Sequence, residues 1–343
     1  MIEENLVQDE VVKEEVIKED LAEEESLEDE IVEERVFIEG QVKIGATISY
    51  KDKEEAYPAV ILITGTGELD RDGNLNQFVT NFYKDLAAFF VASGCVAIRY
   101  DKRGLHETEG DYSTASLSDY TNDAAALVKY ARSLDFVDAT KVLICGHSEG
   151  AMIGTLVAKD EDLAGLILIG GAGISLLDVQ LNQNRLMMEE INKTKGIRGW
   201  FMRLQTSQRG LDANVRRMFK RCTKTKKNII KYGPSTINAK WIREHAAYTS
   251  EDYARMLKEF EKPVLAITGK ADLVMDYKHH DNLSNVENAE VYTPDNVNHM
   301  LREIDDDNSL LTTAQQYMRL AKKAIHAQTA EKMEEWIKKN FLV

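Results

Sequence analysis

The sequence predicts an α/β fold, in which a mostly parallel sheet is covered by helices on both faces. Short apolar runs rich in β-branched residues, such as 59–65 and 141–145, are typical of strands buried on both sides. Helical patterns separate these runs almost throughout, and such alternation joins parallel strands by right-handed crossovers. With 343 residues, of which 43% are hydrophobic, the chain can bury a large core.

The expected elements begin near residue 34. Residues 35–39 and 41–50 read as two strands around Gly40, a hairpin at the edge of the sheet. Further strands are expected at 59–65, 95–100, 141–145, 163–170, 263–269 and 289–292. Helices are expected at 86–93, 120–133, 150–158 and 310–341, the last in two pieces.

The alternation breaks between about residues 175 and 262. This stretch is helical by pattern, contains no good strand, and is punctuated by Gly196, Gly199, Gly210 and Gly233-Pro234. We interpret 175–262 as a helical lid or cap over the carboxyl edge of the sheet, where open α/β sheets bind ligands. The core is then formed by 34–174 and 263–343.

The net charge of −15 is concentrated at one end of the chain. Residues 1–35 hold 16 acidic and three basic residues, whereas the other 308 residues are nearly neutral at −2. We predict that 1–33 form an acidic, disordered tail that serves mainly for solvation. An alternative is attraction to the segment 185–231, which carries a net charge of +11.

Composition excludes several classes of protein. The apolar runs are too short for a membrane span, which needs about 20 residues, and the first residues lack the pattern of a secretory signal. Three cysteines without paired spacing argue against a disulfide framework and a zinc site. We therefore expect a cytoplasmic protein. The basic segment carries no nucleic-acid-binding motif, so no nucleic-acid partner is expected; the oligomeric state stays open.

The strongest motif is Gly146-His147-Ser148-Glu149-Gly150, a G-x-S-x-G sequence between a predicted strand and a predicted helix. A serine on so tight a turn is held in a strained conformation above the sheet. Side chains at the two glycines would collide with the neighbouring strand and helix. Ser148 is therefore the candidate nucleophile; the alternative is a glycine-rich turn without catalysis.

A serine hydroxyl needs a base, and the base needs an orienting acid. Asp272 follows the strand 263–269, and His299 follows the strand near 289–292, so the order Ser148, Asp272, His299 is acid before base. Asp276 is the alternative acid. The other histidines are weaker candidates for the base, and His279 and His280 are expected in a surface helix.

Backbone N–H groups are expected to hold the oxyanion that forms during attack. One belongs to Glu149, after the nucleophile, and the other to Thr66, with Gly67 as its alternative. The Gly65-Thr66-Gly67 run lacks the third glycine of a dinucleotide site, and no Walker A or His-Glu-x-x-His sequence is present. We therefore expect no cofactor and no metal.

Together these landmarks resemble the α/β-hydrolase superfamily, in particular its bacterial esterase and serine-aminopeptidase-like group. The 58–67 strand and turn resemble the family's oxyanion strand, 70–74 its following loop, and 99–104 (Arg-Tyr-Asp-Lys-Arg-Gly) its Asp-x-Arg-Gly strand end. The resemblance covers roughly 34–343. It implies a metal-free enzyme that hydrolyses acyl esters.

Two positions depart from the family pattern. Thr64 stands where the family usually has histidine, which puts the bracing of the oxyanion loop in doubt. His106 follows Arg103-Gly104-Leu105 where the family has smaller residues, so it is a candidate substrate contact, as are Gly67 and His147. Surface placement of His106 is the alternative.

The function expected from these residues is hydrolysis of carboxylic esters with small to medium acyl groups. A serine aminopeptidase is the alternative, with Glu68, Asp70, Glu107 or Glu149 binding the substrate's amine, and a thioesterase is another. A ligand-binding protein without catalysis is the alternative outside enzymes. Methionine and aromatic residues of the insertion either line an adaptable acyl pocket or dock the lid.

Overall fold

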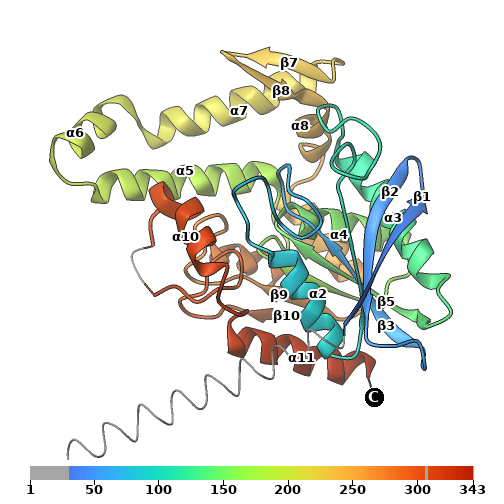
Figure 1. The fold of residues 1–343 in the computed structure, drawn as a ribbon. Coiled ribbons are helices and arrows are strands. Elements are labelled where there is room, and N and C mark those ends of the chain that lie inside the picture. The colour runs from blue at the N-terminus through green and yellow to red at the C-terminus, as the bar shows by residue number, and fades with distance from the viewer. Residues whose placement is uncertain (1–30, 306–307, 343) are drawn as a thin grey trace, which may run out of the picture.

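A computed structural model describes residues 31–305 and 308–342. Its centre is an eight-stranded sheet with the strand order β1-β2-β4-β3-β5-β6-β9-β10 (Figure 1). The strands are β1 (Val32–Glu39), β2 (Lys43–Tyr50), β3 (Tyr57–Ile63), β4 (Val96–Tyr100), β5 (Val137–His147), β6 (Gly165–Ile169), β9 (Val264–Ile267) and β10 (Ala289–Tyr292). Only the pairings β1–β2 and β2–β4 are antiparallel. The predicted fold class is confirmed.

Helices cover both faces of this sheet, because its central strands are apolar on both sides. In β3, Ala59, Ile61 and Ile63 face one core cluster, and Val60 and Leu62 face the other, with the period of two expected for a strand. The first cluster includes α3 (Leu117–Arg132), α4 (Glu149–Asp160) and α9 (Ser250–Phe260). The second includes α2 (Phe82–Ala92) and α11 (Ala327–Phe341).

The segment between β6 and β9 is mainly helical, as predicted. It contains α5 (Leu176–Lys193), α6 (Gly196–Gln205), α7 (Gln208–Lys224), α8 (Ala239–His245) and α9. In Figure 1, α5 and α7 run side by side away from the sheet, with α6 at their far end.

The expectation that this segment contains no strand is wrong. The strands β7 (Ile229–Tyr232) and β8 (Ser235–Asn238) form an antiparallel hairpin, with Gly233-Pro234 as its turn and Gly233 at φ +58°. Each strand has four residues and is partly exposed, so neither produces the apolar run that marks a buried strand.

Other boundaries differ from the prediction in smaller ways. The strand β1 begins at Val32, so ordered structure starts before residue 34; the predicted disorder of the tail concerns residues that, up to position 30, lie outside the described part. The helical end of the chain is in two pieces, α10 (Thr313–Leu320) after the 3-10 turn η2 (Leu310–Thr312), and α11. Within the described ranges, no helix is long and apolar enough to cross a membrane.

His279 and His280 do not lie in a surface helix. They belong to the 3-10 segment η1 (Tyr277–Leu283), and both side chains are buried. Polar histidines give the local sequence a surface character, but the packing of η1 against α9 buries them.

Candidate active site

Ser148 occupies a sharp turn between β5 and α4. Its backbone has φ +57° and ψ −118°, and its N–H donates to the carbonyl of Ile169 at 2.8 Å. A Cβ at Gly146 would lie 2.2 Å from the carbonyl oxygen of Gly150, and one at Gly150 would lie 2.1 Å from that of Ile63. Both positions therefore require glycine, because neighbouring backbone atoms leave no room for a side chain. This agrees with the collision that the sequence analysis expected.

The candidate acid and the candidate base lie on two different loops and are in direct contact. Nδ1 of His299 lies 2.6 Å from Oδ2 of Asp272. The other carboxylate oxygen accepts the backbone N–H groups of Val274 at 2.7 Å and Met275 at 2.8 Å. These bonds fix the Asp272 side chain, and both partners are buried.

The alternative acid is engaged elsewhere. The carboxylate of Asp276 forms an ion pair with Arg185 of α5 and accepts the N–H of Lys278. Its backbone carbonyl, rather than its carboxylate, contacts the ring of His279 at 2.6 Å. The arrangement thus favours Asp272 as the partner of His299.

Gly170 makes room for the imidazole of His299. Gly170, at the end of β6, has φ +59°. A Cβ there would lie 2.8 Å from Cε1 and 2.9 Å from Nδ1 of His299. Both the backbone conformation and the space therefore require glycine next to the candidate base.

Ser148 and His299 share the wall of one cavity of about 520 Å³. Most of its surface is apolar, and its lining comes from the sheet edge, α5, α8 and α10. The side chains that give this character are Leu69, Leu75, Phe78, Met152, Leu176, Val179, Trp241, Val274, Met275, Met300 and Tyr317. The cavity therefore suits an apolar group held beside the serine.

The candidate oxyanion donors lie at the same cavity. Glu149 is the first residue of α4, where a backbone N–H has no partner within the helix. The N–H of Gly65 donates to the Tyr83 hydroxyl at 2.8 Å and is therefore occupied. Thr66 and its alternative Gly67 both line the cavity, so Thr66 stays the candidate for the second donor.

The carboxylate of Glu149 is buried and surrounded by donors. Oε2 accepts from Lys102 Nζ at 2.8 Å and from Thr66 Oγ1 at 3.1 Å. Oε1 accepts from Trp241 Nε1 at 2.6 Å and lies 3.2 Å from His245 Nε2. Burial alone would raise the pKa of Glu149, but the Lys102 charge and the bonds from His245 and Lys102 hold that pKa well below its usual value. Glu149 thus joins the serine turn, the Thr66 loop and α8.

His147 is a buried residue that lines the cavity, and both of its ring nitrogens are engaged in a hydrogen-bond chain. Its Nε2 lies 3.0 Å from the carbonyl of His299 and must donate to it. Its Nδ1 therefore accepts, at 2.9 Å, from the Tyr83 hydroxyl that also receives the Gly65 N–H. Burial, together with nearby His299, lowers the pKa of His147 well below its usual value and keeps the ring neutral.

His106 is also not at the cavity. Its side chain is exposed, with φ +47°, in a separate depression lined by Arg35, Asp70 and Glu107. The surface alternative is therefore the correct one, whereas Gly67 does line the cavity.

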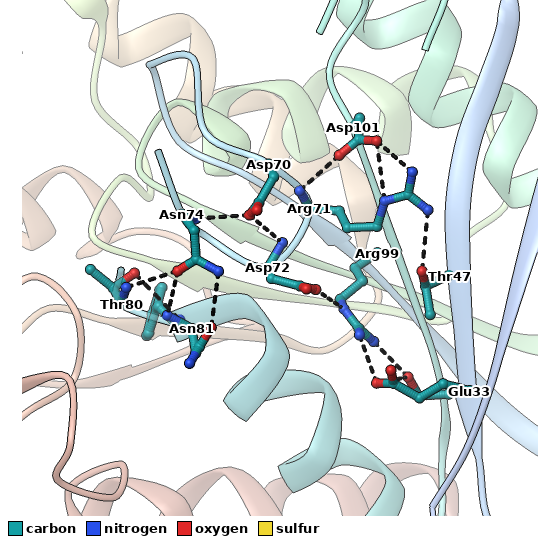
Figure 2. A network of polar contacts seen from close by, with 12 residues as sticks. Glu33, Thr47, Asp70, Arg71, Asp72, Asn74, Thr80, Asn81, Arg99 and Asp101 are labelled. Atoms are coloured by element: carbon teal, nitrogen blue, oxygen red, sulfur yellow. Dashed lines mark hydrogen bonds and ion pairs between the residues drawn. The ribbon is translucent and has the colours of Figure 1, made fainter. Parts of the chain in front are cut away.

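Charged side chains brace the loop after β3 (Figure 2). Arg71 bonds Asp101 through its backbone N–H at 2.9 Å and through Nη2 at 2.5 Å. Arg99 donates to Asp72 at 2.5 Å and to Glu33 of β1 at 2.6 Å. Lys102 Nζ donates to the Gly65 carbonyl at 2.6 Å. These contacts supply the support that Thr64, in place of the family's histidine, left in doubt.

Four residues of this site were missed in the sequence: Tyr83, Lys102, Trp241 and His245. Lys102 lies inside the quoted 99–104 motif, and an unexplained lysine before Arg103-Gly104 was the available signal. His245 is one of the histidines that the sequence analysis considered only as weaker candidates for the base. No local signal marks Tyr83 or Trp241, because their roles depend on the packing of distant elements.

Residues 79–301 match the family model Hydrolase_4, described as serine aminopeptidase, S33. The chain belongs to this family. Among curated proteins, esterase EstD of Thermotoga maritima is 24% identical over 249 residues, which are 71% of this chain and 55% of EstD. The quorum-quenching protein AidA of Acinetobacter baumannii is 30% identical over 133 residues, 38% of this chain and 41% of AidA. The chain thus spans about half the length of the curated relatives it matches.

Solved structures share the fold. Est1E of Butyrivibrio proteoclasticus with bound ferulic acid has a TM-score of 0.58 at 16% identity, covering 90% of this chain and all of Est1E. The Pyrococcus furiosus esterase Pf2001 has a TM-score of 0.55 at 13% identity, covering 92% and 93%. At these identities, the likeness establishes the α/β-hydrolase fold of this Hydrolase_4 family member.

Proposed function

We propose that the protein is a serine hydrolase that cleaves carboxylic esters of small to medium acyl groups. The observation that carries the proposal is the 2.6 Å contact between His299 and Asp272 at the cavity that also exposes Ser148 on its strained turn. The names of relatives in the esterase group support the same class. Binding alone would not require these three residues together.

In the proposed reaction, Oγ of Ser148 attacks the acyl carbonyl. Because Nδ1 of His299 bonds to Asp272, Nε2 is the nitrogen that accepts the serine proton. His299 then donates this proton to the leaving alcohol, and an acyl-serine remains. Water attacks the acyl-serine with His299 again as base, which releases the acid and restores the serine. Asp272 orients the ring and stabilises its positive charge.

The oxyanion is held by the N–H groups of Glu149 and Thr66. The start of α4 adds the positive end of the helix dipole at the same point. Donors that are already in place cost no reorganisation during attack, and one such donor contributes about 3 kcal/mol in comparable enzymes. The reaction uses no cofactor and no metal.

A serine aminopeptidase is the second candidate, since it is the activity for which the family is described. It needs a carboxylate for the substrate's free amine. Glu149 is occupied by Lys102 and the donors of α8, and Glu107 pairs with Arg71. Asp70 lines the separate depression near His106 and accepts the backbone N–H of Asp72. Glu68 lines the cavity and is exposed, so it is the favoured candidate for this role. A thioesterase uses the same serine chemistry and is separated by its substrate.

A substrate panel tests the proposal. Purified protein is assayed with p-nitrophenyl acetate, butyrate and octanoate, the matching thioesters, and aminoacyl-p-nitroanilides. We expect the highest kcat/KM on the short and medium esters, its loss in Ser148→Ala, and no change in the exposed control Ser113→Ala. Preference for anilides, reduced by Glu68→Gln, would instead support the aminopeptidase. Equal ester turnover by Ser148→Ala and wild type would contradict both.

A further inference from the structure

The helix α6 carries a row of large apolar side chains that face solvent. Ile197, Trp200, Phe201 and Leu204 are 84%, 58%, 51% and 69% exposed. They follow the spacing i, i+3, i+4, i+7, which places them on one face of a helix. Single exposed apolar residues are common on protein surfaces, but four large ones on the same face of a helix indicate an interaction surface.

The opposite face of α6 is the one that packs against the protein. A Cβ at Gly199 would lie 1.9 Å from the carbonyl oxygen of Thr194, so the two backbones are in close contact. Nη1 of Arg203 donates to the carbonyls of Ile191 at 3.0 Å and Thr194 at 2.9 Å, at the end of α5. With this side docked, the apolar row points away from the core.

Positive charge surrounds the apolar row. Lys193, Lys195 and Arg209 flank α6 and are exposed, and no carboxylate pairs with them among the residues that the structure describes. The acidic residues near this end of the helical hairpin formed by α5, α6 and α7 already have partners. Glu189 pairs with Arg185, Glu190 accepts a hydrogen bond from Ser309, and Asp212 accepts one from Gln208. The end of the hairpin is therefore apolar and cationic at once.

We propose that α6 docks the protein onto an anionic lipid surface, with the row Ile197, Trp200, Phe201 and Leu204 in the interface. A short helix with tryptophan, phenylalanine and leucine on one face and basic residues beside it is the pattern of helices that lie in the plane of a membrane. Its ten residues span about 15 Å, too short to cross a bilayer. In Figure 1 α6 is the outermost part of the hairpin, so it reaches a flat surface before the sheet and its helices.

The net charge of the whole chain does not oppose this contact. Exposed charges are screened beyond about 8 Å at physiological ionic strength. An anionic lipid surface that contacts α6 therefore interacts mainly with the cations beside α6 and not with the net charge of the chain. Gln183 is the last residue of α5 in the cavity lining, and the ten residues from there to Lys193 place α6 about 15 Å further along the helix. Docking therefore places the enzyme at a lipid surface and leaves hydrolysis of a water-soluble ester unchanged.

Vesicle sedimentation with the full chain tests the proposal. We expect binding to phosphatidylcholine vesicles with about 30% phosphatidylglycerol, and binding at least about tenfold weaker to pure phosphatidylcholine. Trp200→Ser/Leu204→Ser should lower binding to the anionic vesicles at least about tenfold, since partial burial of each ring or chain contributes substantially. Phe37→Ser, an equally exposed aromatic residue on β1, should bind like wild type.

Light scattering and a soluble-ester assay accompany the sedimentation. The double variant should keep wild-type turnover, which shows that it is folded. Absence of wild-type binding to the anionic vesicles, or equal binding by the double variant, would overturn the proposal. A wild-type dimer that becomes a monomer in the double variant would assign the apolar row to a second copy of the chain and also overturn it.

Discussion

At the scale of single residues, Glu149 shows how one position serves the site twice. Its N–H begins α4 beside the serine, and its carboxylate fixes Lys102, whose Nζ in turn holds the Gly65 carbonyl. A buried ion pair of this kind contributes little net stability, but removal of one partner leaves an uncompensated charge. We interpret the pair as a device that positions the two proposed oxyanion donors relative to each other.

The acid of the proposed triad can be tested by paired substitutions. Asp272→Asn should retain the fold but lower kcat on p-nitrophenyl butyrate by about 10⁴-fold, because an amide neither fixes the imidazole tautomer nor stabilises the imidazolium. Asp276→Asn, which removes a contact to Arg185, should change kcat less than about threefold. The reverse ranking in folded variants would assign the acid to Asp276.

His280 predicts a loss of stability in mild acid. Burial and the neighbouring His279 lower the pKa of His280 to about 3, whereas the unfolded chain protonates it below about 6.5. As pH falls through this window, the unfolded state binds a proton that the folded state refuses, so the free energy of unfolding decreases. His280→Gln should reduce the loss between pH 6 and pH 4 by about 2 kcal/mol.

Urea unfolding at several pH values measures this effect. Glutamine can retain a bond to Thr268, which lies 3.1 Å from Nε2 of His280. The exposed His106→Gln is the matched control and should leave the pH dependence as in wild type. Identical slopes for His280→Gln and wild type would show that His280 is protonated in the folded state.

At the scale of elements, the sequence predicted those features that depend on a single strand, helix or turn. The buried strands, the glycines at 146 and 150 and the order of Ser148, Asp272 and His299 were readable, because periodicity and turn sterics are local. The hairpin β7–β8 and the burial of η1 were missed because both depend on packing against other elements. The contacts of Glu149 to α8 were unreadable for the same reason, since Trp241 lies 92 residues away.

The contact between α8 and α4 predicts that the inserted segment influences turnover. Trp241→Phe keeps an aromatic ring but removes the 2.6 Å bond to Glu149, which loosens the serine turn. A lost bond to a buried charge costs about 1.5–3 kcal/mol, so kcat on a short ester should fall about tenfold. Trp200→Phe, at the exposed tip, is the matched control and should leave kcat unchanged. Equal kcat in the two variants would show that α8 does not support the turn.

At the scale of the whole molecule, the chain combines a nearly neutral body with an acidic first segment and a basic hairpin. Sequence reasoning assigned the charge asymmetry correctly but ended the tail at residue 33, two residues too late. The error has a physical cause: Glu33 resembles the acidic residues of the tail, but it pairs with the buried Arg99. Acidic residues of an edge strand cannot be told from a solvated run without their partners.

This boundary predicts two different outcomes for truncation. Removal of 1–30 should leave the melting temperature and turnover of a soluble ester unchanged, because no described contact is lost. Removal of 1–34 takes away the partner of Arg99 and three residues of β1, and should lower the melting temperature by several degrees. Thermal unfolding of both variants checks this; a salt-dependent change in turnover after removal of 1–30 would instead indicate contact with the basic segment 185–231.

The central claim, that Ser148 is the nucleophile, is tested most directly by covalent labelling with a fluorophosphonate and mass spectrometry. The account predicts one adduct per chain in the tryptic peptide 142–159, with fragmentation placing it on Ser148, the single serine of that peptide. Ser148→Ala should carry no adduct. A label on another residue, or an unlabelled wild type that still hydrolyses esters, would contradict the account.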